Sequence, residues 1–382
     1  MKKLLSTLLS LSLAASGLQA EELMQESLES YNNRLEWFKD AQYGLFLHFG
    51  LYSIPGGEWK GRNLDSAVGV GGYSEWIQGI MGIPKEEYAP LIEQFNPQGF
   101  DAEKIVTSAK AAGMKYVVIT TKHHEGFCLW DSQYTEYDLG STPIKDRDLL
   151  KELKDACDKH GLKLGLYYSI IDWHHSSQEP SSKGRKGWAR NTLIEGREQE
   201  YFDYQRNQVL ELIERYDPAI LWFDGDWTPW WTLEEGVKLY NAIRSASDTV
   251  ITNNRVAKRN NFDLDYVTQE QGHFDKAFPK HWEGCYTMNK SWGYKKSDRN
   301  WKSAEEVYNK MKDINEKGGN FLLNAGPDAN GEIQEEAYAI MFETKKLLDG
   351  SPIVKASPEI KTVPGILKES RKVGKKVKVS GQ

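Results

Sequence analysis

The chain repeats one pattern, in which an apolar segment ends in a polar residue and a helical segment follows. Residues 219–226 (AILWFDGD) show the pattern clearly, because a run of apolar residues leads directly to the carboxylate of Asp224. Uninterrupted apolar runs of this kind are typical of parallel strands that are buried on both faces. Strands that alternate with helices in this way predict a parallel sheet covered by helices.

Eight segments can be placed as strands. They lie roughly at residues 42–50, 114–121, 163–170, 219–226, 249–255, 265–270, 285–293 and 320–327. Eight strands in an alternating α/β chain favour a closed (β/α)8 barrel of the TIM type over an open, doubly wound sheet. The connections between the fifth and seventh strands are too short for full helices, so we expect the barrel to be irregular there.

Helices are predicted between most of these strands from their apolar spacing and their capping residues. Asp101 can cap a helix that ends at Gly113. Thr232 and Ser303 each begin a capping box that precedes an apolar stripe. The long first connection, residues 51–100, is expected to shape the pocket on the catalytic face. Further helices are expected at residues 146–160, 195–216 and about 333–348.

Polar side chains at the strand ends should converge, because the carboxyl ends of barrel strands meet on one face and form the active site there. The residues at these ends are His48, His123, His124, Tyr168, Asp224, Arg255, Glu270 and Asn324. The pattern therefore predicts one polar pocket with carboxylates at its centre.

The carboxylates suit glycoside hydrolysis, which needs a nucleophile or base and an acid with a raised pKa. Asp224 is the predicted nucleophile, because it follows a buried strand and precedes Gly225, which leaves room for a close approach. The alternative is that Asp224 only caps the following turn. Glu270 is the predicted acid, and Glu283 is its rival.

The histidines at the strand ends allow two interpretations. His48, His123 and His124 could bind zinc, or they could hydrogen-bond to substrate hydroxyls while they stay neutral near pH 7. Adjacent residues on a strand point to opposite faces, so His123 and His124 are poorly placed to bind one metal ion. We therefore expect no metal and no other cofactor.

Aromatic residues are frequent, with 13 Trp and 19 Tyr. Most of them should pack in the core, but rings at strand and loop ends can pack on the apolar face of a sugar. Trp76 and Trp292 are the main candidates, because each has polar strand-end or loop neighbours.

The N-terminal residues and the charge bear on where the protein acts. Lys2-Lys3, an apolar segment and a cleavage site at Ala20 predict a signal peptide and export to the periplasm or the medium. No later apolar run reaches ~18 residues, so no membrane span is expected.

The formal charge of −6 argues against nucleic acid as the main partner. The cysteines are too few for a disulfide-built fold and are expected to be buried thiols: Cys128, Cys157 and Cys285.

The expected domain organisation has three parts. Residues 1–20 form the signal peptide, residues 21–350 form a catalytic barrel, and residues 351–382 form a basic, flexible tail. The stretch 368–382, which is rich in Lys and Arg, is expected to be disordered.

Seven segments together resemble the family-29 glycoside hydrolases, the retaining α-L-fucosidases. They follow one another in the order of that family and cover roughly residues 35–345, and KHHEGF, WFDG and LLNAGPDANG are specific as a set. The segments are WFKDAQYGLFLHFG (37–50), YSEW (73–76), YVVITTKHHEGFCLWDS (116–132), GLYYSIIDW (165–173), LWFDG (221–225), WEGCYTMNKSWGY (282–294) and GNFLLNAGPDANG (319–331).

The resemblance implies a substrate, a fucosylated oligosaccharide or polysaccharide, and a role for each site residue. Asp224 would form a covalent fucosyl-enzyme, and Glu270 would act as the acid/base, with Glu283 kept as the alternative. Tyr168 would line the site near the nucleophile, and Arg255 would hold the acid-side loop. The residues implied for binding fucose are His48, Glu75, Trp76, His123, His124 and Trp292, the last of them against the C6 methyl group.

Two features depart from the family pattern. The first strand ends in His48-Phe49-Gly50, where the family usually has Trp in the middle. Only roughly 35 residues follow the last predicted helix, too few for the C-terminal β-sandwich of many members, so we expect a barrel without it. The sequence leaves open a transfucosylase, a related glycosidase for galactose or substituted fucose, an inactive sugar-binding homologue and a metal-dependent hydrolase.

Overall fold

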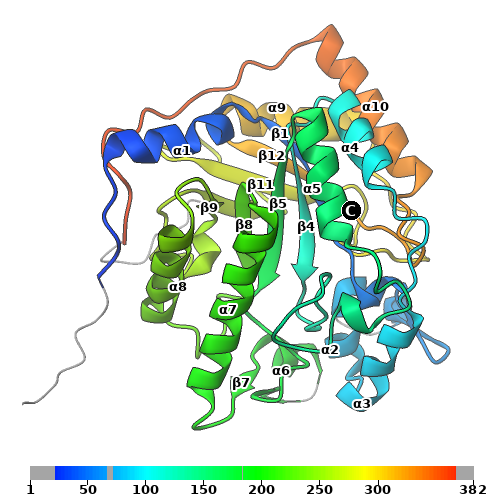
Figure 1. Ribbon diagram of the computed structural model, residues 1–382. Helices are drawn as coiled ribbons and strands as arrows, with labels where there is room; N and C mark the ends of the chain where they lie inside the picture. Colours follow the sequence, from blue (N-terminus) through cyan, green and yellow to red (C-terminus); the bar gives the residue numbers. More distant parts are fainter. Residues whose placement is uncertain (1–21, 67–71, 183, 367–382) are drawn as a thin grey trace, which may run out of the picture.

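An eight-stranded parallel sheet, curled into a barrel, forms the centre of the molecule (Figure 1). The computed structural model describes residues 22–66, 72–182 and 184–366. The order of the strands around the barrel is β10-β11-β12-β1-β4-β5-β8-β9, which confirms the predicted (β/α)8 architecture. The strands are β1 (Tyr43–Leu47), β4 (Tyr116–Lys122), β5 (Lys163–Ser169), β8 (Ile220–Asp224), β9 (Ile251–Thr252), β10 (Val267–Glu270), β11 (Trp282–Thr287) and β12 (Asn320–Ala325).

The barrel closes at its least regular point, between the edge strands β9 and β10. Asn253 and Tyr266 form a parallel bridge there, and Asn254 N donates a hydrogen bond of 2.9 Å to Tyr266 O. The connection between the two strands is fully described, and it contains the 3-10 helix η6 (Asn254–Val256) but no α-helix. The irregularity predicted for this part is confirmed. The seventh strand begins at Trp282, earlier than predicted.

Long helices cover the outside of the barrel (Figure 1). The side chains of Asp101, Thr232 and Ser303 each accept a hydrogen bond from a backbone N–H three residues later and begin three of these helices, as predicted. The inner faces of the helices and the outer faces of the strands form the larger hydrophobic core. The helices are α4 (Ala102–Ala111), α5 (Leu149–His160), α7 (Glu198–Tyr216), α8 (Leu233–Ala246), α9 (Ala304–Glu316) and α10 (Glu335–Gly350).

Helix α1 (Leu28–Asp40), which the apolar spacing did not predict, closes the amino end of the barrel (Figure 1). Tyr31, Leu35 and Phe38 are buried and join the hydrophobic cluster of the barrel interior. The rings of Phe38 and Tyr266 lie 4.4 Å apart. The amino end is therefore filled by apolar side chains.

Residues 351–366 run back from α10 along the same end of the barrel (Figure 1). Ala356 N donates a hydrogen bond of 3.0 Å to Asn315 O, and Lys355 Nζ donates one of 2.6 Å to Asn320 Oδ1. The predicted signal peptide and the basic stretch 368–382 lie outside the described residues.

The carboxyl end of the strands carries shorter elements, which Figure 1 shows around the tips of β4 and β5. Most of them belong to the long first connection, which therefore lies on the face where the predicted site residues end their strands. The elements are the hairpin of β2 (Glu58–Trp59) and β3 (Arg62–Asn63), the hairpin of β6 (Gln178–Glu179) and β7 (Thr192–Leu193), and the helices α2 (Ile77–Met81), α3 (Lys85–Tyr88) and α6 (Arg185–Ala189).

Side chains alternate along each strand between the barrel interior and the helix layer. In β8, Ile220 and Trp222 belong to the interior cluster, whereas Leu221 and Phe223 pack in the core under the helices. Asp224 continues the inward series. Its carboxylate is thereby placed at the carboxyl mouth of the barrel.

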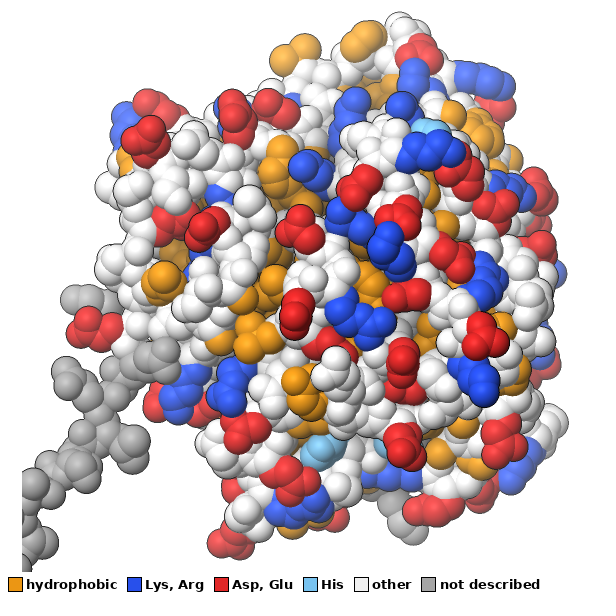
Figure 2. Space-filling view, in the orientation of Figure 1, with side chains coloured by type: hydrophobic (Ala, Val, Ile, Leu, Met, Phe, Trp, Pro, Cys, Tyr) orange, Lys and Arg blue, Asp and Glu red, His pale blue; other side chains and the backbone are white. Residues whose placement is uncertain are grey.

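On the face shown in Figure 2, acidic and basic side chains are interspersed. On α5, Lys151 pairs with Asp155 and Lys154 pairs with Asp158 one helical turn apart. None of the helices in the described ranges has the length and apolarity needed to span a membrane. The three cysteines are buried and free, as predicted: Cys128, Cys157 and Cys285.

Candidate active site

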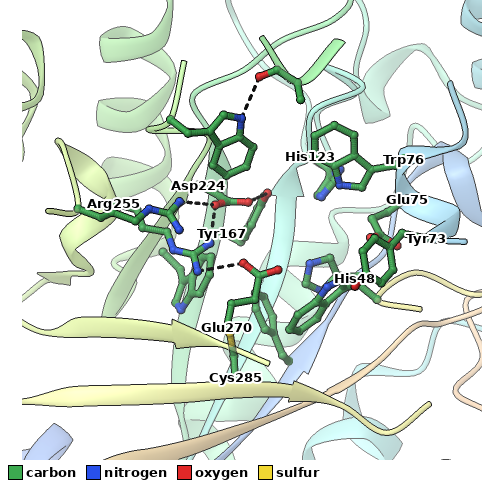
Figure 3. A pocket seen from close by; sticks show the side chains of 16 residues that line it. His48, Tyr73, Glu75, Trp76, His123, Tyr167, Asp224, Arg255, Glu270 and Cys285 are labelled. Atoms are coloured by element: carbon green, nitrogen blue, oxygen red, sulfur yellow. Dashed lines mark hydrogen bonds and ion pairs between the residues drawn. The ribbon is translucent and has the colours of Figure 1, made fainter. Parts of the chain in front are cut away.

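A cavity of about 260 Å³ lies at the carboxyl end of the barrel (Figure 3). Pockets for drug-sized ligands span roughly 300–1,000 Å³, so this cavity suits one small ring rather than a long chain. Of the residues predicted for the site, the cavity lining includes His48, Glu75, Trp76, His123, Asp224, Arg255, Glu270 and Trp292.

Asp224 is the inner carboxylate of the cavity, with a side chain that is 12% exposed. Arg255 Nη1 donates to its Oδ1 at 2.5 Å, and Tyr167 Oη donates to its Oδ2 at 3.2 Å. Burial raises the pKa of Asp224, but the interactions with Arg255, His124 and Arg259 together outweigh burial and hold this pKa below its usual value. Asp224 is therefore kept as a carboxylate.

Arg255 joins the inner carboxylate to an outer one. Its side chain is 1% exposed, and its Nη2 donates to Glu270 Oε2 at 3.1 Å. Its Nε donates to Thr268 Oγ1 at 2.9 Å, and its guanidinium lies 4.7 Å from the ring centre of Trp222. The Glu270 side chain is 40% exposed, so the two carboxylates differ in their access to water although they share one cation.

His48 presents a hydrogen-bond acceptor in the cavity. Asn324 Nδ2 donates to Trp292 O at 2.7 Å, which turns Asn324 Oδ1 toward His48 Nδ1 at 2.6 Å. An amide oxygen only accepts, so His48 carries its proton on Nδ1 and keeps Nε2 as an acceptor. Burial lowers the pKa of His48 to about 3, and the ring is therefore neutral.

His124 touches the inner carboxylate instead of lining the cavity. Ser169 Oγ donates to Ile171 O at 2.6 Å, so it accepts from His124 Nδ1, also at 2.6 Å. His124 Nε2 is then an acceptor that lies 3.7 Å from Asp224 Oδ2. Burial lowers the pKa of His124 to about 4, which keeps this ring neutral too.

Two buried polar atoms of the wall have no hydrogen-bond partner among the described residues, namely His123 Nδ1 and Glu75 Oε1. The other oxygen of Glu75 accepts from Gly293 N at 2.9 Å, and burial raises the pKa of Glu75 to about 7. A buried polar atom without a partner costs roughly 1–3 kcal/mol. These atoms therefore point to a ligand that supplies hydroxyl groups.

Apolar surface adjoins the hydrogen-bonding groups in the same cavity. The Trp292 ring lies 5.1 Å from the His48 ring and 6.1 Å from the Phe46 ring. Trp76 meets His124 edge-on at 4.8 Å. The arrangement suits a ligand that combines hydroxyl groups with an apolar substituent.

The prediction for Tyr168 is corrected by one residue. Tyr168 faces the helix layer, where its Oη donates to Gln208 Oε1 of α7 at 2.7 Å. Tyr167 lies in the cavity instead, because successive residues of β5 point to opposite faces.

Glu283 lies inside the barrel and not in the cavity lining. It is fully buried, and it accepts hydrogen bonds from Tyr116 Oη at 2.6 Å and from Trp222 Nε1 at 2.8 Å. Burial raises the pKa of Glu283 to about 7, a value that would suit a general acid, but both oxygens face protein donors. Glu270 is the carboxyl that the cavity exposes.

Several cavity residues had no predicted role. Arg259 Nε donates to both oxygens of Asp226, at 2.8 and 2.9 Å, and Arg259 Nη2 lies 3.5 Å from Asp224 Oδ1. Trp227 is 37% exposed, and its Nε1 donates to Ala189 O at 2.9 Å. Trp222 and Trp227 line the cavity too, and both are among the aromatic residues at strand and loop ends that were expected to be able to pack on a sugar. The cavity residues without a predicted role are Phe46, Tyr73, Tyr167, Ala189, Arg259 and Cys285.

No group of three or more His, Cys, Asp or Glu side chains with the geometry of a metal site occurs in the part of the chain that the structure describes. Instead, His48 Nδ1 contacts Asn324, His124 Nδ1 contacts Ser169, and His123 Nδ1 is buried without a hydrogen-bond partner among the described residues. Their arrangement fits hydrogen bonding to a ligand.

Several known proteins are similar to this chain in sequence and fold. A family model described as α-L-fucosidase matches residues 11–349. Plasma α-L-fucosidase of Homo sapiens is 30% identical over 340 residues, which cover 82% of this chain and 66% of that protein. The α-L-fucosidase of Dictyostelium discoideum is 27% identical over 331 residues, which cover 80% of this chain and 68% of that protein. The chain thus spans about two thirds of the length of these curated relatives.

A solved α-L-fucosidase structure is also similar to this chain. The α-L-fucosidase AlfC from Lactobacillus casei superposes with a TM-score of 0.73 at 32% identity, over 84% of this chain and 99% of that one. The resemblance carried by the seven sequence segments is confirmed by these matches. The chain belongs to the α-L-fucosidase family of glycoside hydrolases.

Proposed function

We propose that this protein hydrolyses terminal α-L-fucosyl linkages of glycans or polysaccharides with retention of configuration. The observation that carries the proposal is that one buried guanidinium, Arg255, contacts both the shielded carboxylate of Asp224 and the exposed carboxyl of Glu270 in one cavity. Membership of the α-L-fucosidase family supports fucose as the sugar.

The mechanism has two steps. Arg255 holds Asp224 Oδ1 at 2.5 Å, whereas Tyr167 contacts Oδ2 only at 3.2 Å, so Oδ2 attacks the anomeric carbon while Glu270 protonates the leaving oxygen. The C–O bond to the leaving sugar breaks, and a covalent fucosyl-enzyme forms on Asp224. Glu270 then takes a proton from water, which attacks the same carbon and releases both fucose and Asp224. In the substrate complex the two carboxyls should lie ~5–5.5 Å apart, the spacing of retaining enzymes.

Recognition of fucose would divide between hydrogen-bonding and apolar groups. His48 Nε2 and the free oxygen of Glu75 would accept hydrogen bonds from sugar hydroxyls, and His123 Nδ1 would form a further hydrogen bond to the sugar. Trp292 and Phe46 offer apolar surface for the C6 methyl group. The neutral state of the buried histidines keeps their acceptors available near neutral pH.

Hydrolysis of 4-nitrophenyl α-L-fucoside by the wild type tests the proposal. The α-L-galactoside, which carries an additional hydroxyl on C6, is expected to be cleaved roughly 10²-fold less efficiently, because the apolar site for the methyl group would have to bury this hydroxyl. NMR of early product should show α-fucose before it equilibrates. Initial release of β-fucose would contradict retention, and equal turnover of both glycosides would contradict the assignment of the methyl site.

Arg255→Met should move the acidic limb of the kcat/KM profile to higher pH. The guanidinium is the largest influence that lowers the pKa of Asp224, and without it burial raises this pKa, so the nucleophile is lost to protonation at a higher pH. We expect kcat/KM near neutral pH to fall roughly 10²-fold. Arg259→Met is the matched control, because Arg259 approaches Asp224 only at 3.5 Å. An acidic limb that stays in place in Arg255→Met would refute this role.

We also propose export and a three-part chain. The basic, apolar and small-residue segments of residues 1–20 support a signal peptide, which would deliver the enzyme to the periplasm or the medium. Residues 21–350 would form the catalytic barrel, and residues 351–382 would form a basic C-terminal tail.

Transfer of fucose to a sugar acceptor is the second candidate. The same fucosyl-enzyme would react with a sugar hydroxyl in place of water. Two variants of the AlfC enzyme, which are 34% and 32% identical to this chain, are described as fucosyltransferase mutants. Product analysis with an added sugar acceptor separates the two outcomes.

A further inference from the structure

Glu283 is a carboxyl that the proposed reaction does not use, at the centre of the barrel. It comes from β11, two residues before Cys285, which lines the cavity, and therefore lies one layer deeper. Its hydrogen bonds reach Tyr116 on β4 and Trp222 on β8. Around the barrel these strands are far from β11, so the carboxyl of Glu283 spans the interior.

Trp222 connects this buried carboxyl to the cavity. The indole Nε1 donates to Glu283, and the face of the same ring lies 4.7 Å below the guanidinium of Arg255. Tyr167 stacks on Trp222 at 5.5 Å with an interplanar angle of 18°. Arg255 and Tyr167 make the two shorter hydrogen bonds to Asp224, at 2.5 and 3.2 Å, and Arg259 makes a longer one of 3.5 Å. The orientation of one indole therefore affects the two nearest donors to the inner carboxylate.

We propose that Glu283 is a positioning residue for the reaction. Its hydrogen bond fixes the orientation of the Trp222 indole, against which Arg255 and Tyr167 pack. The orientation of the indole in turn sets the geometry of Asp224 and Glu270. The proposal rests on the proposed function of the site. A carboxylate suits this task because Trp222 Nε1 can only donate and Tyr116 Oη is placed to donate. An apolar residue at this position would leave both donors buried without a partner.

Glu283→Met and Tyr116→Phe separate this role from general support of the fold. Glu283→Met removes both acceptors, whereas Tyr116→Phe removes one donor and leaves the bond to Trp222 intact. We expect Glu283→Met to lower kcat on 4-nitrophenyl α-L-fucoside roughly 10- to 100-fold with little change in KM, because the hydroxyl-binding groups are untouched. Tyr116→Phe should keep a kcat close to that of the wild type.

The indole N–H resonance of Trp222 gives a readout that needs no substrate. It can be assigned in ¹⁵N-labelled protein by its absence from Trp222→Phe. In the wild type and in Tyr116→Phe we expect slow hydrogen exchange at this group, and in Glu283→Met a shifted resonance and faster exchange. Glu283→Gln is the second variant, to be used if Glu283→Met does not fold. The amide oxygen of the glutamine can still accept a hydrogen bond from Trp222. We therefore expect the kcat of Glu283→Gln to stay within roughly tenfold of the wild-type value.

Three results would overturn the proposal. The first is wild-type kcat or an unchanged Trp222 resonance in folded Glu283→Met. The second is a loss in Glu283→Gln that grows with poorer leaving groups and is rescued by azide, because that pattern belongs to an acid/base. The third is that the wild-type protein cleaves no fucoside. This result would refute the proposed function and, with it, the role of Glu283 in the reaction. Hydrogen exchange at the Trp222 indole would still show whether the contact between Glu283 and Trp222 exists.

Discussion

Asp224→Asn is expected to lower kcat roughly 10⁴- to 10⁶-fold, the range seen when a nucleophile is removed. Asparagine keeps the size of the side chain and an oxygen that can accept from Arg255, so the cavity should keep its shape. What is lost is the negative charge and the attacking oxygen. Steady-state hydrolysis of 4-nitrophenyl α-L-fucoside, together with thermal melting, measures both consequences.

Asp226→Asn is the matched control for this substitution. Asp226 lies two residues after Asp224, beyond the end of β8, and is also buried, but its side-chain oxygens accept hydrogen bonds from Arg259 and not from Arg255. It should lose far less activity than Asp224→Asn. Near-normal turnover by Asp224→Asn, or an equal loss in both variants, would refute Asp224 as the nucleophile.

Glu270→Ala is expected to lower kcat on fucosyl disaccharides roughly 10²- to 10⁴-fold, the usual contribution of a general acid. The loss should be much smaller on aryl fucosides with acidic phenols, because such leaving groups depart without a proton. A series of aryl fucosides of increasing phenol pKa measures this dependence.

Azide provides the control for the same variant. Removal of the Glu270 carboxyl leaves space at a side chain that is 40% exposed, so azide should enter, speed turnover and give α-L-fucosyl azide. A loss that is the same for every leaving group, with no azide product, would show that Glu270 is not the acid/base.

Much of the fold could be predicted because its signals are local. Each main strand is a continuous apolar run, and the helices carry capping residues that bond within their own first turn. Helix α1 escaped prediction because its buried face includes Arg34, whose charge is balanced by Asp265 at 2.8 Å. That partner is more than 200 residues away in the sequence, so the helix face did not look apolar.

The site was partly predictable for a different reason. Residues that end parallel strands must meet, which brought His48, Asp224 and Glu270 together in the prediction. The choice between Tyr167 and Tyr168 failed because both faces of β5 are buried, so the apolar pattern does not show which side chain faces inward. Arg259 was missed because it lies in a connection, where only the folded chain shows its neighbours.

The proposed mechanism requires a covalent bond between fucose and Asp224. A slow substrate, 2-deoxy-2-fluoro-fucosyl fluoride, should trap this intermediate, and mass spectrometry of the digested protein would locate it. We expect one fluorofucosyl group on the peptide that contains Asp224, and no label in Asp224→Asn. A label on another carboxylate, such as Glu270, or an enzyme that turns the reagent over to inverted fluorofucose without any adduct, would contradict the account.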